Sequence, residues 1–564
     1  MRMRLAIPFA TLLFSACSTN PPSPVVRIPS TWPHQQRVAE VRAEHAMVAS
    51  DAPLASRAGV EVLRAGGNAV DAAVATGFAL AVVYPEAGNL GGGGFTVVRM
   101  ADGRVAAIDY REMAPLAATR DMYANDTTDA SVVGPLASGV PGSVAGMVET
   151  HARFGRLPLA VVLAPAIRLA DEGFVVDSLL GRSLRQYASL IGRFEGGKVF
   201  LPGGEPLARG ALLKQPALAR TLRAIAAEGA AAFYTGSISG DVASDLRAAG
   251  SIITAEDLAR YEVEWREPLR ATYRGHTLIT MPPPSSGVTM VQALNILEGF
   301  APLPPYGSAR HSHLVASAMQ RAFVDRNAQL ADPAFASVPT ERLADKSYAA
   351  RLRASIRDRA TATQALASPV EGQHTTHYSV ADAEGNVVST TTTINDLYGS
   401  GVYLPTVGIF MNDEMDDFAA NPGKPNLFGL VQGEQNAIQP GKRMLSSMLP
   451  TVVLDRAGRP LLIVGARGGP RIVTSVLQTI VNVVDHRMSL ADAINAPRIH
   501  HQALPDTIRY ERNGFTRAFL DSLGALGYGT AEIGNIGSVN GIMRSGDHWV
   551  GYSDPRSGGR PAGY

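Results

Sequence analysis

The residues with the clearest chemical potential are two adjacent threonines about two-thirds along the chain. Residues 373–382 are Gln-His-Thr-Thr-His-Tyr-Ser-Val-Ala-Asp. Polar and apolar side chains roughly alternate from Thr376 to Ala381, which predicts a half-buried strand. A threonine hydroxyl is a poor nucleophile until a base takes its proton, and no nearby Asp or His is placed as that base. Cleavage of the His374–Thr375 bond would free an α-amine with a pKa of about 7.7–8.0, which could then activate the Thr375 hydroxyl.

A second strand should pair with the first. Residues 387–394 (VVSTTTTI) are rich in β-branched side chains and follow a plausible turn at residues 383–386, which predicts a hairpin. With the turn centred on Glu384, Thr375 faces Thr393, and a register error of one residue would place Ile394 there instead. The hairpin therefore sets two threonine hydroxyls side by side. On spacing alone, a surface threonine on a Thr-rich strand is the favoured interpretation of Thr375.

Two acidic residues and an amide follow the hairpin. Asn395 lies two residues past Thr393, so we expect it on the same strand face. Glu414 and Asp417 are three apart in MNDEMDDF (residues 411–418), and they share a face if this segment is a helical turn. The pair could be a solvated charge run or a metal pair. The metal interpretation is weak because no histidine cluster lies beside the two acids.

The other short signals are ambiguous by themselves. Ser446-Ser447 precede an expected strand and indicate a cap or a loop. Gly468-Gly469 allow close backbone approach. His500-His501 invite a general-base interpretation, but neighbouring loop histidines are more often structural, and a free α-amine makes a histidine base unnecessary. Arg111, at the end of an expected strand, would ordinarily be solvated.

The segments that must position these residues begin near residue 44. Residues 54–65 and 68–83 are predicted helices, and the second is apolar nearly all round, so it should be buried between layers. Four glycines at residues 91–94 predict tight backbone packing. Residues 95–100 and 105–110 alternate and predict a hairpin that leads into Arg111. We interpret residues 144–359 as helical layers and scaffold, and assign them no chemistry.

Composition excludes several classes of function. The chain has 564 residues, of which 46% are hydrophobic and 18% charged, as in an ordinary globular protein with a large core. The formal net charge of +1 argues against nucleic acid or an anionic membrane surface as a partner. The single cysteine means that the chain has no internal disulfide.

The first 17 residues look like a lipoprotein-type secretory signal. Arg2 and Arg4 supply a positive end, the apolar run that follows is too short to span a bilayer, and Phe14-Ser15-Ala16-Cys17 resembles a bacterial lipobox. Residues 18–34 are rich in Pro, Ser and Thr and indicate a tether. We expect a periplasmic protein anchored by lipid at Cys17, with the outer membrane favoured. The alternative is ordinary signal cleavage and release into the periplasm.

The motifs together resemble the γ-glutamyltranspeptidases (γ-glutamyltransferases, glutathione hydrolases) of the N-terminal-nucleophile hydrolase group. The resemblance spans about residues 35–560 in the family's order. Upstream it includes GNAVDAAVA, GNLGGGGF, DYREMAP, GVPGS and PPPSSG. From Thr375 onward it includes TTHYSVAD-x-x-GN, T-x-N, MNDEMDDF, LSSMLPT, GARGGPRI, NAPRIHHQ and SDPR.

The resemblance assigns roles to the candidate residues. Thr375 would be the nucleophile, Thr393 would orient its amine, and the N–H groups of Gly468 and Gly469 would form the oxyanion hole. The substrate-binding set would be Arg111, Ser446 and Ser447 for the α-carboxylate, with Asn395, Glu414 and Asp417 for the α-ammonium. Residues 421–440 match a lid found in some members. Phe428 stands there at the position where members with the lid often have tyrosine.

The resemblance also implies an architecture and a maturation. The expected fold is α+β, a four-layer αββα sandwich of the N-terminal-nucleophile hydrolase type. The chain would cut itself between His374 and Thr375, giving a large subunit (35–374) and a small catalytic subunit (375–564) that remain together as a heterodimer. Substrates would be glutathione and other γ-glutamyl compounds, with water, amino acids or dipeptides as acceptors, and no metal or cofactor. The alternatives are a cephalosporin or glutaryl acylase and a non-catalytic γ-glutamyl-peptide-binding lipoprotein.

Overall fold

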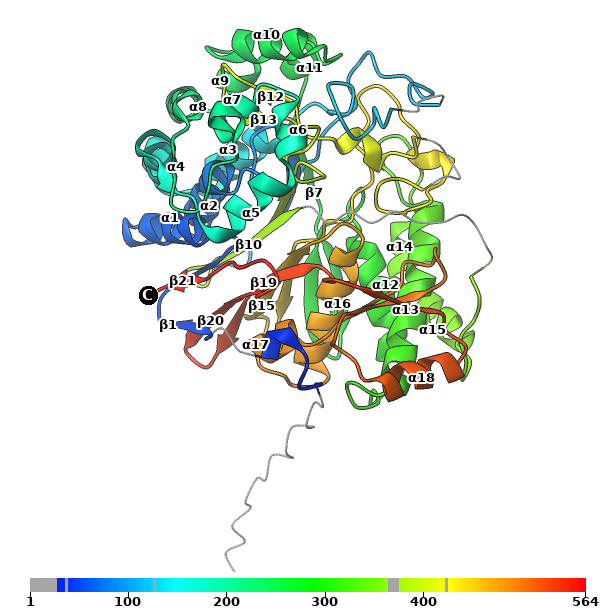
Figure 1. Cartoon of the computed structure of the whole chain (residues 1–564). Coiled ribbons are helices and arrows are strands. Elements are labelled where there is room, and N and C mark those ends of the chain that lie inside the picture. The colour runs from blue at the N-terminus through cyan, green and yellow to red at the C-terminus, as the bar shows by residue number, and fades with distance from the viewer. Residues whose placement is uncertain (1–27, 36–38, 125–127, 364–374, 421–424) are drawn as a thin grey trace, which may run out of the picture.

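Two β-sheets stack face to face, and helices cover the outer face of each (Figure 1). The computed structural model describes residues 28–35, 39–124, 128–363, 375–420 and 425–564. The predictions for the signal segment, Cys17, most of the tether and His374 lie outside these residues. The arrangement is the predicted four-layer αββα sandwich of an α+β protein, which is thereby confirmed.

In the described part of the chain each sheet has seven strands, and each draws strands from both sides of the His374–Thr375 bond. The first sheet has the order β21 (Ala562–Gly563), β2 (Met47–Ala49), β10 (Thr376–Ala381), β11 (Val387–Thr393), β3 (Gly93–Arg99), β4 (Val105–Tyr110) and β7 (Glu264–Arg266). The second has the order β1 (Val41–Ala43), β20 (His548–Ser553), β19 (Ser538–Ser545), β15 (Pro460–Arg467), β14 (Thr451–Leu454), β9 (His276–Thr280) and β8 (Leu269–Tyr273).

Two helical layers enclose the sheets. The layer over the first sheet includes α1 (Pro53–Arg64), α2 (Ala69–Val83), α3 (Ser143–Phe154), α4 (Leu159–Glu172) and α8 (Pro216–Glu228). The layer over the second includes α12 (Gly287–Glu298), α13 (Ala309–Gln329), α15 (Lys346–Ala354) and α16 (Arg471–Val484). Further helices at the periphery are α5 (Ser178–Gln186), α10 (Ser239–Ala249), α17 (Leu490–Asn495) and α18 (Arg517–Ala525). No helix of the described chain combines the length and the apolar character that a membrane crossing needs.

Helix α2 shows how the sequence builds the central layers. Asn68 caps it by accepting from the N–H groups of Val70 and Asp71, and the Asp71 carboxylate accepts from the Asn68 N–H to complete a capping box. Every residue of α2 is buried, as its all-round apolar sequence predicts. The helix packs directly on β10 and β11, so it supports the strand that begins beside Thr375.

The hairpin register agrees with the spacing argument. Thr376 pairs with Thr392, and Ala381 pairs with Val387, which is the register obtained by centring the turn on Glu384. Gly385 takes a left-handed φ of 90° at that turn. The predicted half-buried character of β10 is wrong, because every residue of this strand is buried. The helical layer covers one face and the second sheet covers the other, so the polar side chains of β10 bond within the core.

A second correction concerns the scaffold region, residues 144–359. Its helices are present, but β7, β8 and β9 interrupt them and add strands to both sheets. These strands are only three to five residues long, too short to give a clear alternating pattern. The region therefore contributes to the central sheets as well as to the helical layers.

Candidate active site

One narrow pocket brings together most of the predicted site residues. It encloses about 250 Å³ of empty space. Its lining residues are Thr375, Thr393, Asn395, Glu414, Asp417, Phe428, Ser446, Ser447, Met448, Gly469 and Ile472. Gly468 precedes Gly469 in the chain, and Arg111 contacts the two acids of the lining. A larger hollow, with about 2120 Å³ of empty space, lies between α6 (Ala188–Gly192), α7 (Gly197–Phe200) and α10, but no Ser, Thr, Cys or His lines it.

Thr375 lies immediately before β10 and is 4% exposed. The next residue fixes this strand end, because the Thr376 hydroxyl donates to Asp51 Oδ2 at 2.9 Å. Asn540 donates to the other Asp51 oxygen at 3.1 Å and to the His377 carbonyl at 2.9 Å. These bonds join β10 to the second sheet, so the strand end beside the nucleophile candidate is held from two sides. Sequence reasoning missed Asp51 and Asn540.

Asn395 reaches the pocket by a different route from the one predicted. Strand β11 ends at Thr393, and Asn395 lies beyond it with a left-handed φ of 70°, a conformation that asparagine tolerates well. Its N–H donates to Thr393 Oγ1 at 2.7 Å, and its Nδ2 donates to the Asp413 carbonyl at 3.0 Å. The prediction that Asn395 shares a strand face with Thr393 is therefore wrong. The left-handed turn still brings both into one pocket, with the amide oxygen of Asn395 left for a ligand.

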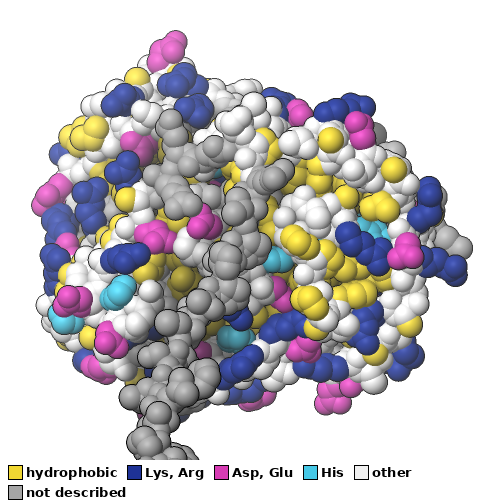
Figure 2. Space-filling view, turned by 90° about the horizontal axis from the view of Figure 1, so that it is seen from below, with side chains coloured by type: hydrophobic (Ala, Val, Ile, Leu, Met, Phe, Trp, Pro, Cys, Tyr) yellow, Lys and Arg dark blue, Asp and Glu magenta, His cyan; other side chains and the backbone are white. Residues whose placement is uncertain are grey.

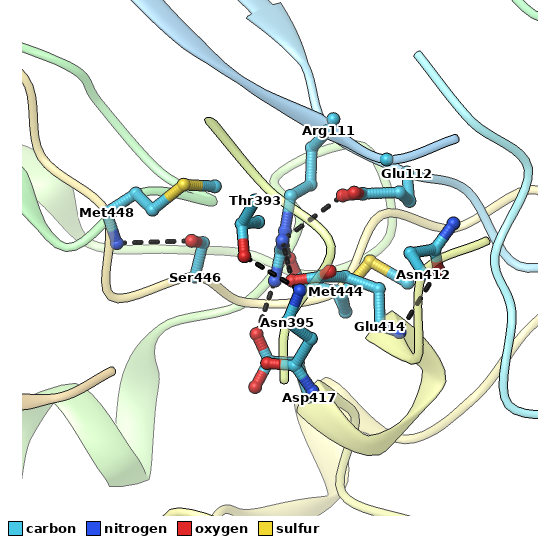
Figure 3. A network of polar contacts seen from close by, with 12 residues as sticks. Arg111, Glu112, Thr393, Asn395, Asn412, Glu414, Asp417, Met444, Ser446 and Met448 are labelled. Atoms are coloured by element: carbon cyan, nitrogen blue, oxygen red, sulfur yellow. Dashed lines mark hydrogen bonds and ion pairs between the residues drawn. The ribbon is translucent and has the colours of Figure 1, made fainter. Parts of the chain in front are cut away.

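Glu414 and Asp417 lie on a 3-10 turn (Glu414–Asp417), as their spacing predicts. Both form ion pairs with Arg111 (Figure 3). Arg111 also pairs with Glu112 at 3.1 Å, and its Nε donates to the Met444 carbonyl at 3.4 Å. Arg111 is fully buried, so three carboxylates surround one guanidinium away from water. No cluster of metal ligands occurs among the residues that the structure describes.

This charge cluster shifts the protonation of its members. Burial raises the pKa of Glu112 to about 7, although Arg111 opposes the shift. Burial also raises the pKa of Glu414 well above its ordinary value and that of Asp417 above its own, again against the attraction of Arg111. One guanidinium cannot fully compensate three buried carboxylates. The site is therefore suited to receive a second cation beside the acids.

The serine pair lies on an extended segment before β14, held by the loop of residues 282–287. The Ser446 N–H donates to the Pro284 carbonyl at 2.8 Å, and the Ser286 hydroxyl donates to the Ser446 carbonyl at 2.6 Å. Ser446 Oγ accepts from the Met448 N–H at 3.1 Å. Ser447 Oγ accepts from Arg326 Nη2 at 3.1 Å. Both hydroxyls are thus acceptors toward the protein, which leaves their protons for a ligand.

Gly468 and Gly469 join β15 to α16 with φ angles of 130° and 55°. Residues other than glycine rarely adopt such φ angles. A Cβ on Gly469 would also lie 2.7 Å from Cδ1 of Phe428. Within the described residues neither N–H donates to a backbone carbonyl. This turn therefore has two backbone donors without a carbonyl partner in the described chain, as an oxyanion hole requires. Arg467, just before it, points away to Tyr84 and Glu86.

Phe428 lines the pocket and packs against Gly469. Its loop is fastened by Asn426, whose Oδ1 accepts from the N–H groups of Phe428 and Leu430, both at 3.1 Å. Gln502 donates to the carbonyls of Phe428 and Gly429 at 3.3 and 3.1 Å. The described part of the predicted lid, residues 425–440, thus covers the pocket with a phenyl ring.

The adjacent histidines, His500 and His501, have a structural role. Both His500 and His501 are buried. His500 contacts Thr474 Oγ1 at 2.9 Å and Gln502 Oε1 at 2.8 Å, and burial lowers its pKa well below the ordinary value. A neutral imidazole that orients Gln502 fits the structural interpretation of this pair better than a general base.

Comparison with known proteins gives one consistent result. A family model described as Gamma-glutamyltranspeptidase matches residues 55–564. The glutathione hydrolase proenzyme of Escherichia coli (strain K12) is 44% identical over 98% of this chain and 97% of its own. The acylase ACY 1 proenzyme of Pseudomonas sp. (strain SE83) is also 44% identical, over 85% and 86%. The crystal structure of a cephalosporin acylase from Bacillus halodurans is similar with a TM-score of 0.84 at 28% identity, covering 95% of this chain and 99% of that one.

The family match covers far more than half of the chain, and it spans the strands, the 3-10 turn and the glycine turn that form the pocket. We conclude that this chain belongs to the γ-glutamyltranspeptidase family.

Proposed function

We propose that the chain is a γ-glutamyltransferase with glutathione hydrolase activity, matured by cleavage before Thr375. The observation that carries this proposal is the pocket in which Thr375 lies beside an acid pair and a serine pair. A nucleophile, groups for an α-ammonium and groups for an α-carboxylate are all needed to recognise a γ-glutamyl amide. The names of the relatives support the same activity.

Maturation would use the same hydroxyl as catalysis. Thr375 Oγ attacks the His374 carbonyl carbon, and the acyl group moves from nitrogen to oxygen. Water then hydrolyses the ester, which gives a carboxylate on His374 and a free α-amine on Thr375. The two polypeptides would stay associated, because both sheets contain strands from each of them.

In turnover, the α-amine of Thr375 takes the proton from its own hydroxyl as Oγ attacks the γ-amide carbonyl of the donor. The N–H groups of Gly468 and Gly469 hold the oxyanion. The amide nitrogen leaves with the proton from the α-ammonium, and a γ-glutamyl ester remains on Thr375. Water, an amino acid or a dipeptide then attacks this ester and frees the enzyme.

Donor binding would exchange partners within the charge cluster. In the structure Arg111 pairs with Glu414 and Asp417. The donor's α-ammonium would take these two carboxylates and the Asn395 amide oxygen. Its α-carboxylate would take Arg111 and the hydroxyls of Ser446 and Ser447. The cluster therefore changes partners on binding and gains no net charge from a zwitterionic donor.

A glutaryl or cephalosporin acylase is the second candidate, favoured by the acylase ACY 1 relative at 44% identity. A glutaryl group has no α-ammonium, so it would leave Glu414 and Asp417 without a new partner. Release of p-nitroaniline from the γ-glutamyl and glutaryl anilides separates the two. We expect the γ-glutamyl anilide to be strongly preferred, and a preference for the glutaryl anilide would assign the acylase activity instead.

The substitution Thr375→Ala tests both cleavage and catalysis. We expect the variant to remain one polypeptide on a denaturing gel and to release no p-nitroaniline from the γ-glutamyl anilide. The wild type should give two bands, the smaller beginning at Thr375 by N-terminal sequencing. A variant that is still cut, or an active wild type that stays intact, would contradict the proposal. An intact and inactive wild type would favour the non-catalytic binder.

We also propose export to the periplasm with lipid attachment at Cys17, on the strength of the signal-like segment and lipobox-like motif. Labelling with radioactive palmitate in a bacterial host tests the anchor. We expect label in the wild type and none in Cys17→Ser. Unlabelled wild type in the soluble periplasmic fraction would support release.

A further inference from the structure

Helix α13 places a buried cation behind the serine pair. Arg326 is 1% exposed. Its Nε donates to Ser286 Oγ at 2.8 Å and its Nη2 to Ser447 Oγ at 3.1 Å. Its Nη1 donates to the side-chain oxygen of Asn327 at 3.1 Å. All three partners are neutral.

Arg326 has no carboxylate within ion-pair distance among the described residues. Arg498 and Arg556 are as deeply buried, but each has an acidic partner, Asp554 at 2.8 Å and Glu511 at 2.6 Å respectively. A buried charge without a counter-ion is costly. Burial lowers the pKa of Arg326 to about 10, so the guanidinium still carries its charge at neutral pH. The protein thus keeps at this wall of the pocket a buried cation whose hydrogen-bond partners are all neutral, and Asp417 attracts it only from beyond ion-pair distance.

The hydrogen bonds of Arg326 reach both serines. It contacts Ser447 directly, and it reaches Ser446 through Ser286, which donates to the Ser446 carbonyl. Because a guanidinium only donates, the Ser447 hydroxyl must accept from it and turn its own proton elsewhere. Ser447 lines the pocket, so the proton is available to an anion bound there.

We propose that Arg326 is a positioning residue for the donor's α-carboxylate: it orients the Ser447 hydroxyl toward the pocket and supplies the positive charge behind it. The inference rests on the proposed γ-glutamyl activity and adds to it a residue from α13. Arg111 can be occupied by Glu414 and Asp417, whereas Arg326 has no acidic competitor in contact with it. The α-carboxylate of the donor would be the counter-ion of Arg326, and the Ser447 hydroxyl would lie between the two groups.

The test compares two inhibitors that differ only in the α-carboxylate, L-glutamate and 4-aminobutyrate. Each is measured as an inhibitor of γ-glutamyl-p-nitroanilide hydrolysis by the wild type, Arg326→Gln and Arg326→Lys. In Arg326→Gln we expect the donor KM and the inhibition constant of L-glutamate to rise about tenfold or more, the usual size for a lost charged hydrogen bond. The constant of 4-aminobutyrate and kcat should change much less. Arg326→Lys should recover part of the loss.

Arg321 supplies a matched control, because it lies on the same helix and hydrogen-bonds Ser355 at 2.8 Å without touching the pocket residues. Arg321→Gln should leave both inhibition constants unchanged. Should Arg326→Gln fail to mature into two subunits, Arg326→Lys decides by the same comparison. Equal weakening of both inhibitors, or a loss in kcat alone, would overturn the inference while leaving the proposed activity intact. A wild type unable to hydrolyse the γ-glutamyl anilide would instead overturn the activity.

Discussion

At the scale of single residues, the charged side chains proposed to bind the donor form ion pairs with one another. Arg111 forms ion pairs with Glu414 and Asp417. A zwitterionic donor offers one cation and one anion, so it can replace both halves of this arrangement. A donor with only one of the two charges would leave a buried group without its partner, which is costly. The proposed selectivity for γ-glutamyl groups would follow from this cost.

Replacing one acid should shift that selectivity. In Asp417→Asn we expect the KM for γ-glutamyl-p-nitroanilide to rise about 10- to 100-fold, because a charge-assisted hydrogen bond contributes about 1.5–3 kcal/mol. The KM for glutaryl-p-nitroanilide, which lacks the ammonium, should fall or stay constant. Steady-state kinetics with both anilides provide the measurement. A parallel rise for both substrates would show that Asp417 only maintains the shape of the pocket.

Local patterns in the sequence predicted elements that carry pocket residues, whereas the family resemblance assigned those residues to one site. The 3-10 turn of Glu414 and Asp417 and the Thr-rich hairpin are examples. Glu112, Ser286 and Arg326 were not among the predicted site residues. Arg326 is 121 residues away from Ser447 in the chain, and no periodicity connects such positions. Only the folded structure brings them together.

At the scale of elements, the tight packing of β3 against β11 positions the hairpin. Gly92, just before β3, has no room for a side chain, since a Cβ there would lie 2.0 Å from the Thr393 carbonyl oxygen. The Asn89 side chain donates to the same carbonyl at 2.9 Å and accepts from the Gly92 N–H at 3.0 Å. The glycine run predicted as tight packing therefore determines how closely the strands approach beside Thr393.

This close approach predicts a defect in maturation. Gly92→Ala should push β11 away from β3, because the clash is with backbone that cannot rotate aside. We expect a loss of soluble protein or accumulation of an uncut precursor, both seen on denaturing gels. Gly240→Ala in α10 is the control, since a Cβ there meets nothing within 4 Å. Normal maturation of Gly92→Ala would refute the packing argument.

At the scale of the whole molecule, the layers of the fold could be anticipated from the hairpins, the apolar helix and the family resemblance. The contribution of β7, β8 and β9 to the sheets could not be anticipated. These strands are too short for a clear alternation of polar and apolar residues. The surface also fits the composition. On the face shown in Figure 2, acidic and basic side chains are interspersed and neither sign forms a continuous patch.

Buried histidines should make the molecule sensitive to acid. Burial lowers the pKa of His311 to about 3, and the neighbouring His486 contributes to the same shift. Between that value and the ordinary value near 6.5 the unfolded chain binds more protons than the folded one. Stability should therefore fall as the pH drops through this window, by about 1.4 kcal/mol per pH unit for each such group.

The substitution His311→Gln should remove the contribution of His311 to this pH dependence of the unfolding free energy. Glutamine can still hydrogen-bond to His486 but does not titrate, so the loss of stability between pH 6.5 and 5 should be smaller by about 1.6 kcal/mol. Urea unfolding at the two pH values measures the difference. His45→Gln is the control, because His45 is exposed. Identical pH dependence in the wild type and His311→Gln would contradict the assignment.

Each sheet contains strands from both sides of residue 375, so the proposed cut before Thr375 would make assembly irreversible. Before the cut, the two halves are joined and find each other at a high local concentration. After it, neither half alone contains a complete sheet, and their reunion depends on chance encounter in dilute solution. The mature enzyme would then persist because its dissociation is slow rather than because lost partners can be regained. The covalent link would be needed for the two halves to assemble. After cleavage, subunits that had separated would not readily form the folded enzyme again.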